Sequence, residues 1–282
     1  MAHETPDNRP HRRLRPTRRG RLVLLIGAVL VLAVAAAVLV PLLTREPRTE
    51  QPRTLVIPEG RRATQVYAAV DKALGRPAGT TAKTVATADL PLPAEAKGNP
   101  EGYLFPATYP VTSATTPKSL LRYMVDTAVE RFGADHITAG ARRNDVTVYQ
   151  TVTIASIVQA EADTEADMGK VARVIHNRLD RGMPLQMDST LNYAMNRSTL
   201  DTTTGDTKID SPYNSYDHKG LPPTPIGNPG EQAMTSAIGP TPGPWLYFVT
   251  VAPGDTRFTD DYAEQQRNVA EFNRNRRSEG EG

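Results

Sequence analysis

Ile154-Ala155-Ser156-Ile157-Val158-Gln159-Ala160-Glu161-Ala162 places a carboxylate on the apolar side of a predicted helix. At helical spacing, Ile154, Ile157 and Val158 share one face with Glu161. A carboxyl group on the buried side of a helix loses hydration, and this desolvation raises its pKa. A raised pKa suits a general acid near neutral pH. The alternative is a solvated glutamate just past the end of the apolar face, because glutamate is rarely buried.

The composition allows a folded core over most of the 282 residues and excludes chemistry that needs a thiol. Hydrophobic residues make up 39% of the chain and charged residues 23%, enough for one large domain or two smaller ones. Because there is no cysteine, disulfides, thiolate zinc sites, a cysteine nucleophile and a lipidated cysteine anchor are excluded. The five histidines have no metal-ligand spacing, and no nucleophile elbow or phosphate-binding glycine loop occurs. We therefore expect no metal and no cofactor, which leaves carboxylate acid chemistry open.

The positive charge of the chain is concentrated at its amino-terminal end. Residues 1–21 hold seven arginines against Glu4 and Asp7, a net charge of +5 out of a total of +2, which leaves −3 for the remainder. A weakly acidic remainder argues against nucleic acid as the partner. We expect 1–21 to be a disordered basic tail.

An uncharged run of 22 apolar residues, LVLLIGAVLVLAVAAAVLVPLL, follows at 22–43. It is long enough to cross the hydrocarbon core of a bilayer as a helix. The preceding arginines predict a cytoplasmic amino end, so that everything after about residue 45 lies outside the cell membrane. The competing interpretation is a cleaved signal peptide, but the run is long for one and its Ala-x-Ala candidates at 33–37 lie mid-span. We favour an uncleaved single-pass anchor.

The remaining sequence predicts an α+β fold. After a charged tether at 44–53, we expect a small subdomain at 54–95, a mixed α/β catalytic domain with long loops at 96–275 and a polar tail at 276–282. The best predicted strand, 245–251, is apolar throughout and is expected to be buried on both faces. Other predicted elements are a strand at 54–60, an extended joint at 101–111, and helices at 62–74, 117–132, 231–238 and 261–273, with two more after capping boxes at 147–150 and 164–167.

Between 182 and 241 the chain is rich in glycine, proline, asparagine, serine and threonine, yet it contains clusters of aromatic and amide side chains. Aromatic rings stack on sugar faces, and amides hydrogen-bond to hydroxyl and acetamido groups. Irregular surface loops are the alternative, but long loops without secondary structure are uncommon unless they are functional. The clusters therefore favour a carbohydrate groove.

Taken together, these clusters resemble the membrane-bound endolytic murein (peptidoglycan) transglycosylase family over about 55–275. That family has a single amino-terminal membrane anchor and a small LysM-like subdomain, which the resemblance places here at 54–95. The matching motifs are EGYLFPATY (101–109), ASIVQAE (155–161), NRL (177–179), GMPLQMDSTLNY (182–193), SPYNSY (211–216), GLPPTPIGNPG (220–230) and LYFV (246–249).

The resemblance implies endolytic cleavage of the β-1,4 bond between N-acetylmuramic acid and N-acetylglucosamine, with 1,6-anhydro ends and no water consumed. The family often has Ser-Ile-Val-Glu-x-Glu where this chain has Gln159 and Glu161. Since glutamine cannot serve as an acid, the role falls to Glu161. Near the carboxyl end many members carry histidine where Thr256 and Gln265 stand here, so any role of those histidines is in doubt for this chain.

We expect substrate-binding residues in the loop motifs, either in the groove or supporting it: Gln186, Asp188, Tyr213, Asn214, Tyr216 and Asn228. Asp188 is the rival acid and would make the protein a hydrolase with two carboxylates. The expected partners are glycan strands, the membrane and peptidoglycan synthases. The alternative function is a non-catalytic, membrane-anchored scaffold that binds peptidoglycan and recruits those synthases.

Overall fold

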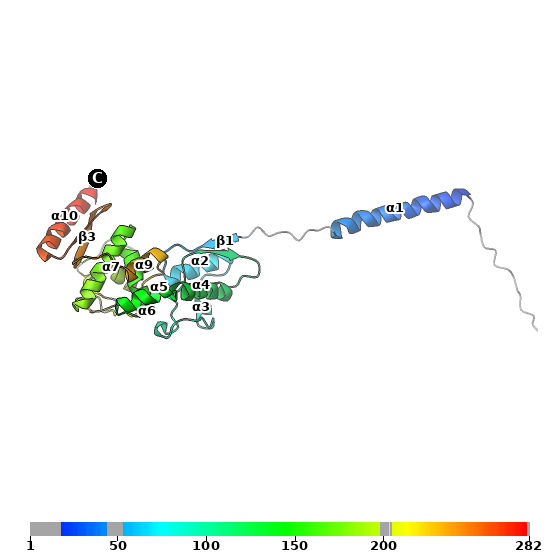
Figure 1. Ribbon diagram of the computed structural model, residues 1–282. Coiled ribbons are helices and arrows are strands. Elements are labelled where there is room, and N and C mark those ends of the chain that lie inside the picture. Colours follow the sequence, from blue (N-terminus) through cyan, green and yellow to red (C-terminus); the bar gives the residue numbers. More distant parts are fainter. Residues whose placement is uncertain (1–17, 44–52, 198–202, 204, 281–282) are drawn as a thin grey trace, which may run out of the picture. The chain divides into compact units, whose positions relative to one another are not determined.

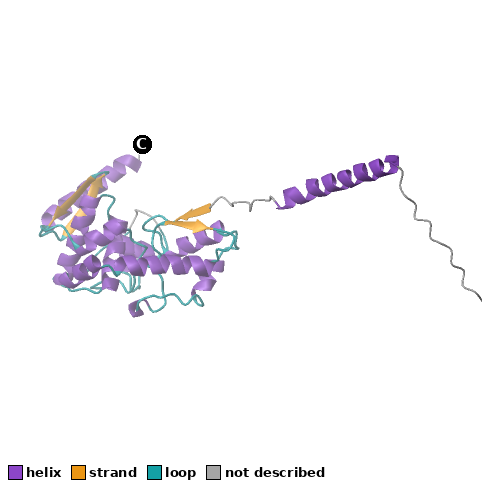
Figure 2. Cartoon of the chain, turned by 45° about the vertical axis from the view of Figure 1, so that its right-hand side comes forward, coloured by secondary structure: helices purple, strands orange, loops and turns teal. Residues whose placement is uncertain are grey.

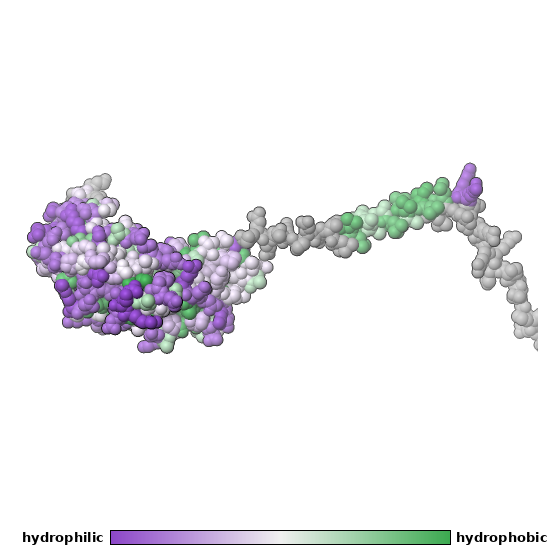
Figure 3. Space-filling view, in the orientation of Figure 1, coloured by the Kyte–Doolittle hydropathy of each residue, from purple (hydrophilic) through white to green (hydrophobic). Residues whose placement is uncertain are grey.

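The computed structural model describes residues 18–43, 53–197, 203 and 205–280 (Figure 1). The chain divides into two compact units, Met1–Gln51 and Pro52–Gly282. In the first unit, α1 (Arg18–Leu43) covers the apolar run, and those of its hydrophobic side chains that the structure describes, such as Leu25 and Val31, are exposed (Figure 3). Among the described residues, no helix combines the length and the apolarity needed to cross a membrane. The anchor expected at 22–43 therefore stays a prediction, and most of the tail at 1–21 and of the tether at 44–53 lies outside the described residues.

The second unit begins with two strands that pair although residues 57–107 lie between them in the chain. β1 (Arg53–Val56) pairs antiparallel with β2 (Thr108–Val111), with Arg53 opposite Val111. Between them lie α2 (Ala63–Ala73), α3 (Thr80–Val85) and the 3₁₀ helix η1 (Ala94–Ala96). The joint predicted at 101–111 thus ends in β2.

One hydrophobic cluster joins this first part to α4 (Pro117–Phe132), the helix predicted at 117–132. It combines Leu55 and Val66 with Leu104 and Leu121, all buried. By its backbone contacts 52–282 forms one compact unit, and the domain boundaries expected within it, at 53/54 and 95/96, stay a prediction.

The central helix of the larger core is α6 (Val148–Glu161), which contacts α5 (Asp135–Arg143), α7 (Glu165–Asp180), α8 (Asp188–Ala194) and α9 (Glu231–Ile238). Its β-branched run weakens intrinsic helix propensity. The helix is nevertheless continuous, because packing on all sides outweighs that propensity. The hydroxyls of Thr151 and Thr153 donate to the carbonyls of Thr147 and Tyr149, one turn back, at 3.0 Å in each case.

Both predicted helix starts are confirmed. Thr147 and Gln150 form reciprocal bonds of 3.1 and 2.8 Å between side chain and backbone at the start of α6. Thr164 begins α7 by accepting from the N–H of Asp167 at 3.2 Å. There the hydroxyl of Thr164 also donates to the Asp167 carboxylate at 2.9 Å, a local variation on the capping box that the sequence predicted.

The carboxyl-terminal part differs from the prediction. β3 (Tyr247–Ala252) is only half-buried, and it pairs with β4 (Asp255–Thr259), a strand that the sequence did not indicate (Figure 2). The prediction of a strand buried on both faces was therefore wrong, because β3 packs mainly against β4 and α10 (Tyr262–Gly280), with a smaller contact to α7, and remains partly exposed. α10 also extends through most of the polar tail expected at 276–282.

Candidate active site

Glu161 is the last residue of α6, and its side chain is half-buried. The chain turns to extended backbone at Ala162, so the carboxylate projects from the helix end. Its Oε1 accepts a hydrogen bond from the backbone N–H of Ser189 at 3.1 Å. Burial raises the pKa of Glu161, the charge of Asp188 adds to this increase, and hydrogen bonding by Ser189 opposes it. The predicted direction of this shift is therefore supported, although the helix ends at the residue.

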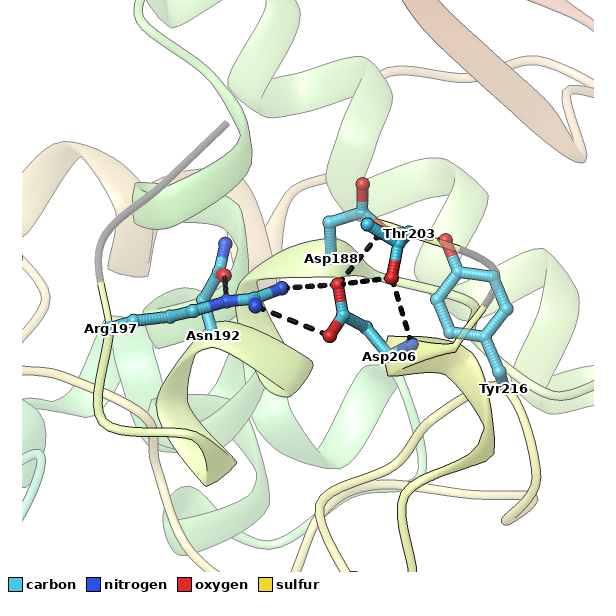
Figure 4. A network of polar contacts seen from close by, with 6 residues as sticks. All are labelled: Asp188, Asn192, Arg197, Thr203, Asp206 and Tyr216. Carbon is cyan, nitrogen blue, oxygen red and sulfur yellow. Dashed lines mark hydrogen bonds and ion pairs between the residues drawn. The ribbon is translucent and has the colours of Figure 1, made fainter. Parts of the chain in front are cut away.

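Two of the predicted groove residues lie next to Glu161. Asp188 begins α8, immediately before the residue that donates to Glu161. The hydroxyl of Tyr216 donates to Oδ1 of Asp188 at 2.5 Å (both residues are labelled in Figure 4). Burial raises the pKa of Tyr216, and the carboxylates of Asp188 and Glu161 raise it further. Glu161, Asp188 and Tyr216 thus form one electrostatically coupled group.

Gln186 is exposed on the loop that leads to α8, and its backbone has a φ of +54°. Its side-chain Oε1 accepts from Nη1 of Arg178 at 3.0 Å. The buried Arg178 also donates to the carbonyls of Pro184, Leu185 and Leu246, at 2.9, 2.9 and 2.6 Å. Arg178 therefore fixes this loop and the start of β3. No local sequence pattern indicated these partners, because Leu246 lies 68 residues away.

Tyr213 is half-buried and contacts a second tyrosine. Its ring centroid lies 4.9 Å from that of Tyr193, and its hydroxyl lies 2.8 Å from the hydroxyl of Thr224. The pair is built from α8 and from the loop that also carries Tyr216. This arrangement leaves Tyr213 a candidate for contact with a sugar ring.

Asn214 is fully buried and supports the loops. Its amide nitrogen donates to the carbonyls of Thr207 and Ile209 at 3.1 and 2.9 Å, and its oxygen accepts from the N–H of Tyr216 at 3.1 Å. Both ends of the Asn214 side chain are therefore bonded to backbone groups. Asn214 thus positions Tyr216.

Asn228 is also fully buried. Its amide nitrogen donates to the carbonyl of Arg61 at 2.7 Å and to Glu101 at 3.3 Å, and its oxygen accepts from the N–H of Leu104 at 2.7 Å. Asn228 therefore joins three segments of chain. Of the two roles expected for both asparagines, in the groove or in support of it, this burial favours support.

Glu101, which the sequence did not single out, is a second buried carboxylate with 3% of its surface exposed. It accepts from the N–H of Ala63 at 2.9 Å, from the hydroxyl of Tyr193 at 3.1 Å and from Asn228. Burial raises its pKa to about 7, against the opposing effects of these hydrogen bonds and of Arg62. Because its partners are 38, 92 and 127 residues away, no local pattern could have identified it.

Gln159 lies two residues before Glu161 but has a structural contact. Its Oε1 accepts from the N–H of Gly230, at the start of α9, at 3.0 Å. A β-carbon added at Gly230 would meet the Glu59 carboxylate, so the chain passes closely here. Gln159 therefore ties α6 to α9.

Arg197 and Asp206 form a bidentate ion pair after α8 (Figure 4), with hydrogen bonds of 3.2 and 2.7 Å. Arg197 also donates to Asn192 at 3.0 Å, and Asp206 accepts from the N–H and the hydroxyl of Thr203 at 2.7 and 2.9 Å. This network lies in the same view as Asp188 and Tyr216. It joins the end of the turn after α8 to the 3₁₀ helix η2 (Asp206–Lys208). Within the described ranges, no group of three or more potential metal ligands occurs.

The chain matches a family model and several known proteins. Residues 33–271 match the model of the YceG-like family. The chain is 36% identical to an endolytic murein transglycosylase of Bacillus subtilis over 171 residues, which cover 59% of the chain and 46% of the relative. It is 38% identical to an endolytic murein transglycosylase of Streptococcus pneumoniae over 177 residues, 61% of the chain and 32% of the relative. The chain thus spans less than half the length of these curated relatives.

A solved structure agrees with the family match. The crystal structure of a YceG-like protein from Listeria monocytogenes aligns with a TM-score of 0.68 and 27% sequence identity, covering 78% of this chain and 76% of that one. The family model itself covers well over half of the 282 residues. The chain therefore belongs to the YceG-like family.

Proposed function

We propose that this chain is an endolytic lytic transglycosylase of peptidoglycan, with Glu161 as its single catalytic acid and base. The observation that carries the proposal is the environment of this carboxylate. It is half-buried, its pKa is raised, and among the described residues the backbone N–H of Ser189 donates to its Oε1. One oxygen is thus held in place while the other remains able to carry a proton towards substrate.

In the proposed reaction, protonated Glu161 donates its proton to the oxygen that links N-acetylmuramic acid to N-acetylglucosamine. The resulting carboxylate then accepts the proton of the muramic C6 hydroxyl. The C6 oxygen attacks C1 of the same sugar, the glycosidic bond breaks, and a 1,6-anhydro end forms. Donor and acceptor are the same group, so Glu161 returns to its starting state.

A hydrolase that used Asp188 as its second carboxylate would need that group free to attack C1 or to activate water. Oδ1 of Asp188 accepts a 2.5 Å bond from Tyr216, which leaves Oδ2 for such a role. A negative charge beside Glu161 favours the protonated acid, because it disfavours a second charge. We therefore assign Asp188 and Tyr216 to the support of Glu161, with Tyr213 and Gln186 as contacts for the sugar chain.

The biological setting completes the proposal. The helix at 22–43 anchors the chain in the cell membrane with 1–21 in the cytoplasm, and the catalytic part lies outside. The unit at 54–95 is LysM-like and holds a glycan strand. Cleavage of nascent strands at the membrane terminates their elongation, next to the peptidoglycan synthases that produce them.

The test is digestion of purified glycan strands by the wild type and by Glu161→Gln. The matched control is Glu165→Gln, which changes an exposed glutamate of the neighbouring helix. We expect cleavage by the wild type and the control, and none by Glu161→Gln. Binding of strands without cleavage by the wild type would overturn the proposal and favour the scaffold function.

A further inference from the structure

The hydroxyl of Ser189 is a buried polar group that lacks a hydrogen-bond partner among the described residues. The neighbouring hydroxyls are satisfied, both that of Thr190 in the same turn and that of Ser215 in the loop at 211–216. Thr190 donates to the carbonyl of Met187 at 2.7 Å, and Ser215 accepts from the N–H of Met187 at 2.9 Å. Because buried polar groups are nearly always bonded, an unpaired hydroxyl in an otherwise satisfied turn calls for a functional explanation.

The backbone of Ser189 already serves Glu161. Its N–H donates to Oε1 of Glu161 at 3.1 Å, which brings the hydroxyl beside the same carboxylate. The hydroxyl contributes to lowering the pKa of Glu161 from this position, although it does not complete a hydrogen bond in the structure. A rotation about one side-chain torsion is all that a serine needs to redirect its hydroxyl.

We propose that Ser189 is a positioning residue whose hydroxyl turns to donate a hydrogen bond to Glu161 once Glu161 has released its proton. An ionised carboxylate only accepts hydrogen bonds, whereas a protonated one also donates. The ideal partner of the Ser189 hydroxyl therefore exists in only one of the two states through which Glu161 passes. The hydroxyl stabilises the base form and leaves the acid form free to donate.

Other groups that face Glu161 act in the opposite direction or through each other. Asp188, from α8, favours the protonated form by its charge. Tyr216, from the loop at 211–216, lies in the field of both carboxylates and donates to Asp188. Arg178, from α7, acts on Tyr216. Ser189 supplies a hydroxyl donor to the base form of Glu161. Removing this hydroxyl should therefore raise the pKa of Glu161, whereas removing the charge of Asp188 should lower it.

The inference rests on the proposed role of Glu161, and its test is chosen to be independent of glycan cleavage. The full chain is labelled with carboxyl-¹³C glutamate, and the resonance of Glu161 is assigned by its loss in Glu161→Gln. Its titration is then followed in the wild type, Ser189→Ala and Ser189→Thr. Ser113→Ala, an exposed serine in the turn after β2, is the control.

We expect Ser189→Ala to raise the pKa of Glu161 by about one unit, because a hydrogen bond to the charged form is lost. Ser189→Thr keeps the hydroxyl and should retain the wild-type value, as should Ser113→Ala. The pH profile of kcat/KM should move in the same direction as the titration. An unchanged titration in Ser189→Ala, or a threonine variant that titrates like the alanine variant, would overturn the inference. Absence of cleavage by the wild type would instead refute the proposed function, and the titration would still decide the role of Ser189.

Discussion

Glu101 and Glu161 are two carboxylates of one compact unit whose pKa values are both raised by burial. Glu101 accepts from a backbone N–H, a tyrosine hydroxyl and a side-chain amide, and 3% of its surface is exposed. Glu161 is half-buried, with a single N–H on one oxygen. The pKa shifts of the two carboxylates have the same direction. The two differ in how many hydrogen-bond donors of the described residues hold their oxygens.

The comparison shows that a perturbed pKa alone does not identify a catalytic acid. Glu101 joins α2, α8 and the loop at Asn228, so its oxygens are committed to the fold. Glu161 ends a helix and keeps one oxygen available. We infer that Glu101 supports structure and that Glu161 supports chemistry, and the following changes test that division from the largest expected effect to the smallest.

The largest effect is expected for glutamine at the two positions. Glu161→Gln should lower the rate of glycan cleavage by about 1,000-fold, the contribution of a positioned general acid and base. Glu101→Gln should keep activity within about threefold, because glutamine retains an acceptor for Ala63 and Asn228. Release of soluble fragments from purified strands measures both. A larger loss at Glu101 than at Glu161 would reverse the assignment.

The second-largest effect is expected in the pH dependence of the free energy of unfolding. The pKa of Glu101 is raised from 4.5 to about 7, so its stabilising contribution is complete below about pH 4.5 and is lost as the pH rises towards 7. The loss amounts to roughly 3 kcal/mol in the free energy of unfolding. Chemical denaturation at pH 5 and pH 8 should therefore show a larger decrease for the wild type than for Glu101→Gln. Equal decreases in the two proteins would show that Glu101 is ionised in both states.

A third change separates support from chemistry among the polar loop residues. Asn228→Ala should lower the free energy of unfolding by about 2 kcal/mol, because it leaves buried groups of Leu104 and Arg61 unpaired. Tyr216→Phe removes only the bond to Asp188, and we expect a roughly tenfold loss of activity with little change in stability. Calorimetry and glycan digestion on both variants give the comparison. An inactive but fully stable Asn228→Ala would return Asn228 to the substrate groove.

The smallest effect is expected at Gln159. Gln159→Glu keeps an acceptor for the N–H of Gly230 and adds a carboxylate two residues from Glu161. Stability should change by less than about 1 kcal/mol. The double variant Gln159→Glu, Glu161→Gln should remain inactive in the digestion assay, because position 159 faces α9. Recovered cleavage would show that either position can supply the acid.

The sequence predicted the parts of this molecule whose signals are local. The starts of α6 and α7, the helices at 117–132 and 231–238, and the carboxylate at the end of the apolar face all follow from spacing and capping. β4 was not predicted because its sequence, DTRFT, is polar and short. The burial of β3 was overestimated because an apolar run does not reveal how many neighbours cover it.

The site could be predicted only in part, because hydrogen bonds between segments far apart in the sequence decide the roles of its residues. An asparagine in a loop can bind either a ligand or a backbone group, and residue type alone does not distinguish the two. For Asn214 and Asn228 the sequence left a place in the groove and a place in support of it open, and the hydrogen bonds to backbone groups favour support. The hydrogen bonds of Glu101 and the burial of the Ser189 hydroxyl depend on segments that only folding brings together.

The most direct test of the central claim is mass spectrometry of the fragments released from purified glycan strands by the wild type and by Glu161→Gln. We expect the wild type to release fragments that are one water lighter than fragments with reducing ends, and Glu161→Gln to release none. Reducing ends from the wild type, or undiminished cleavage by Glu161→Gln, would contradict the assignment of Glu161 as the single acid and base.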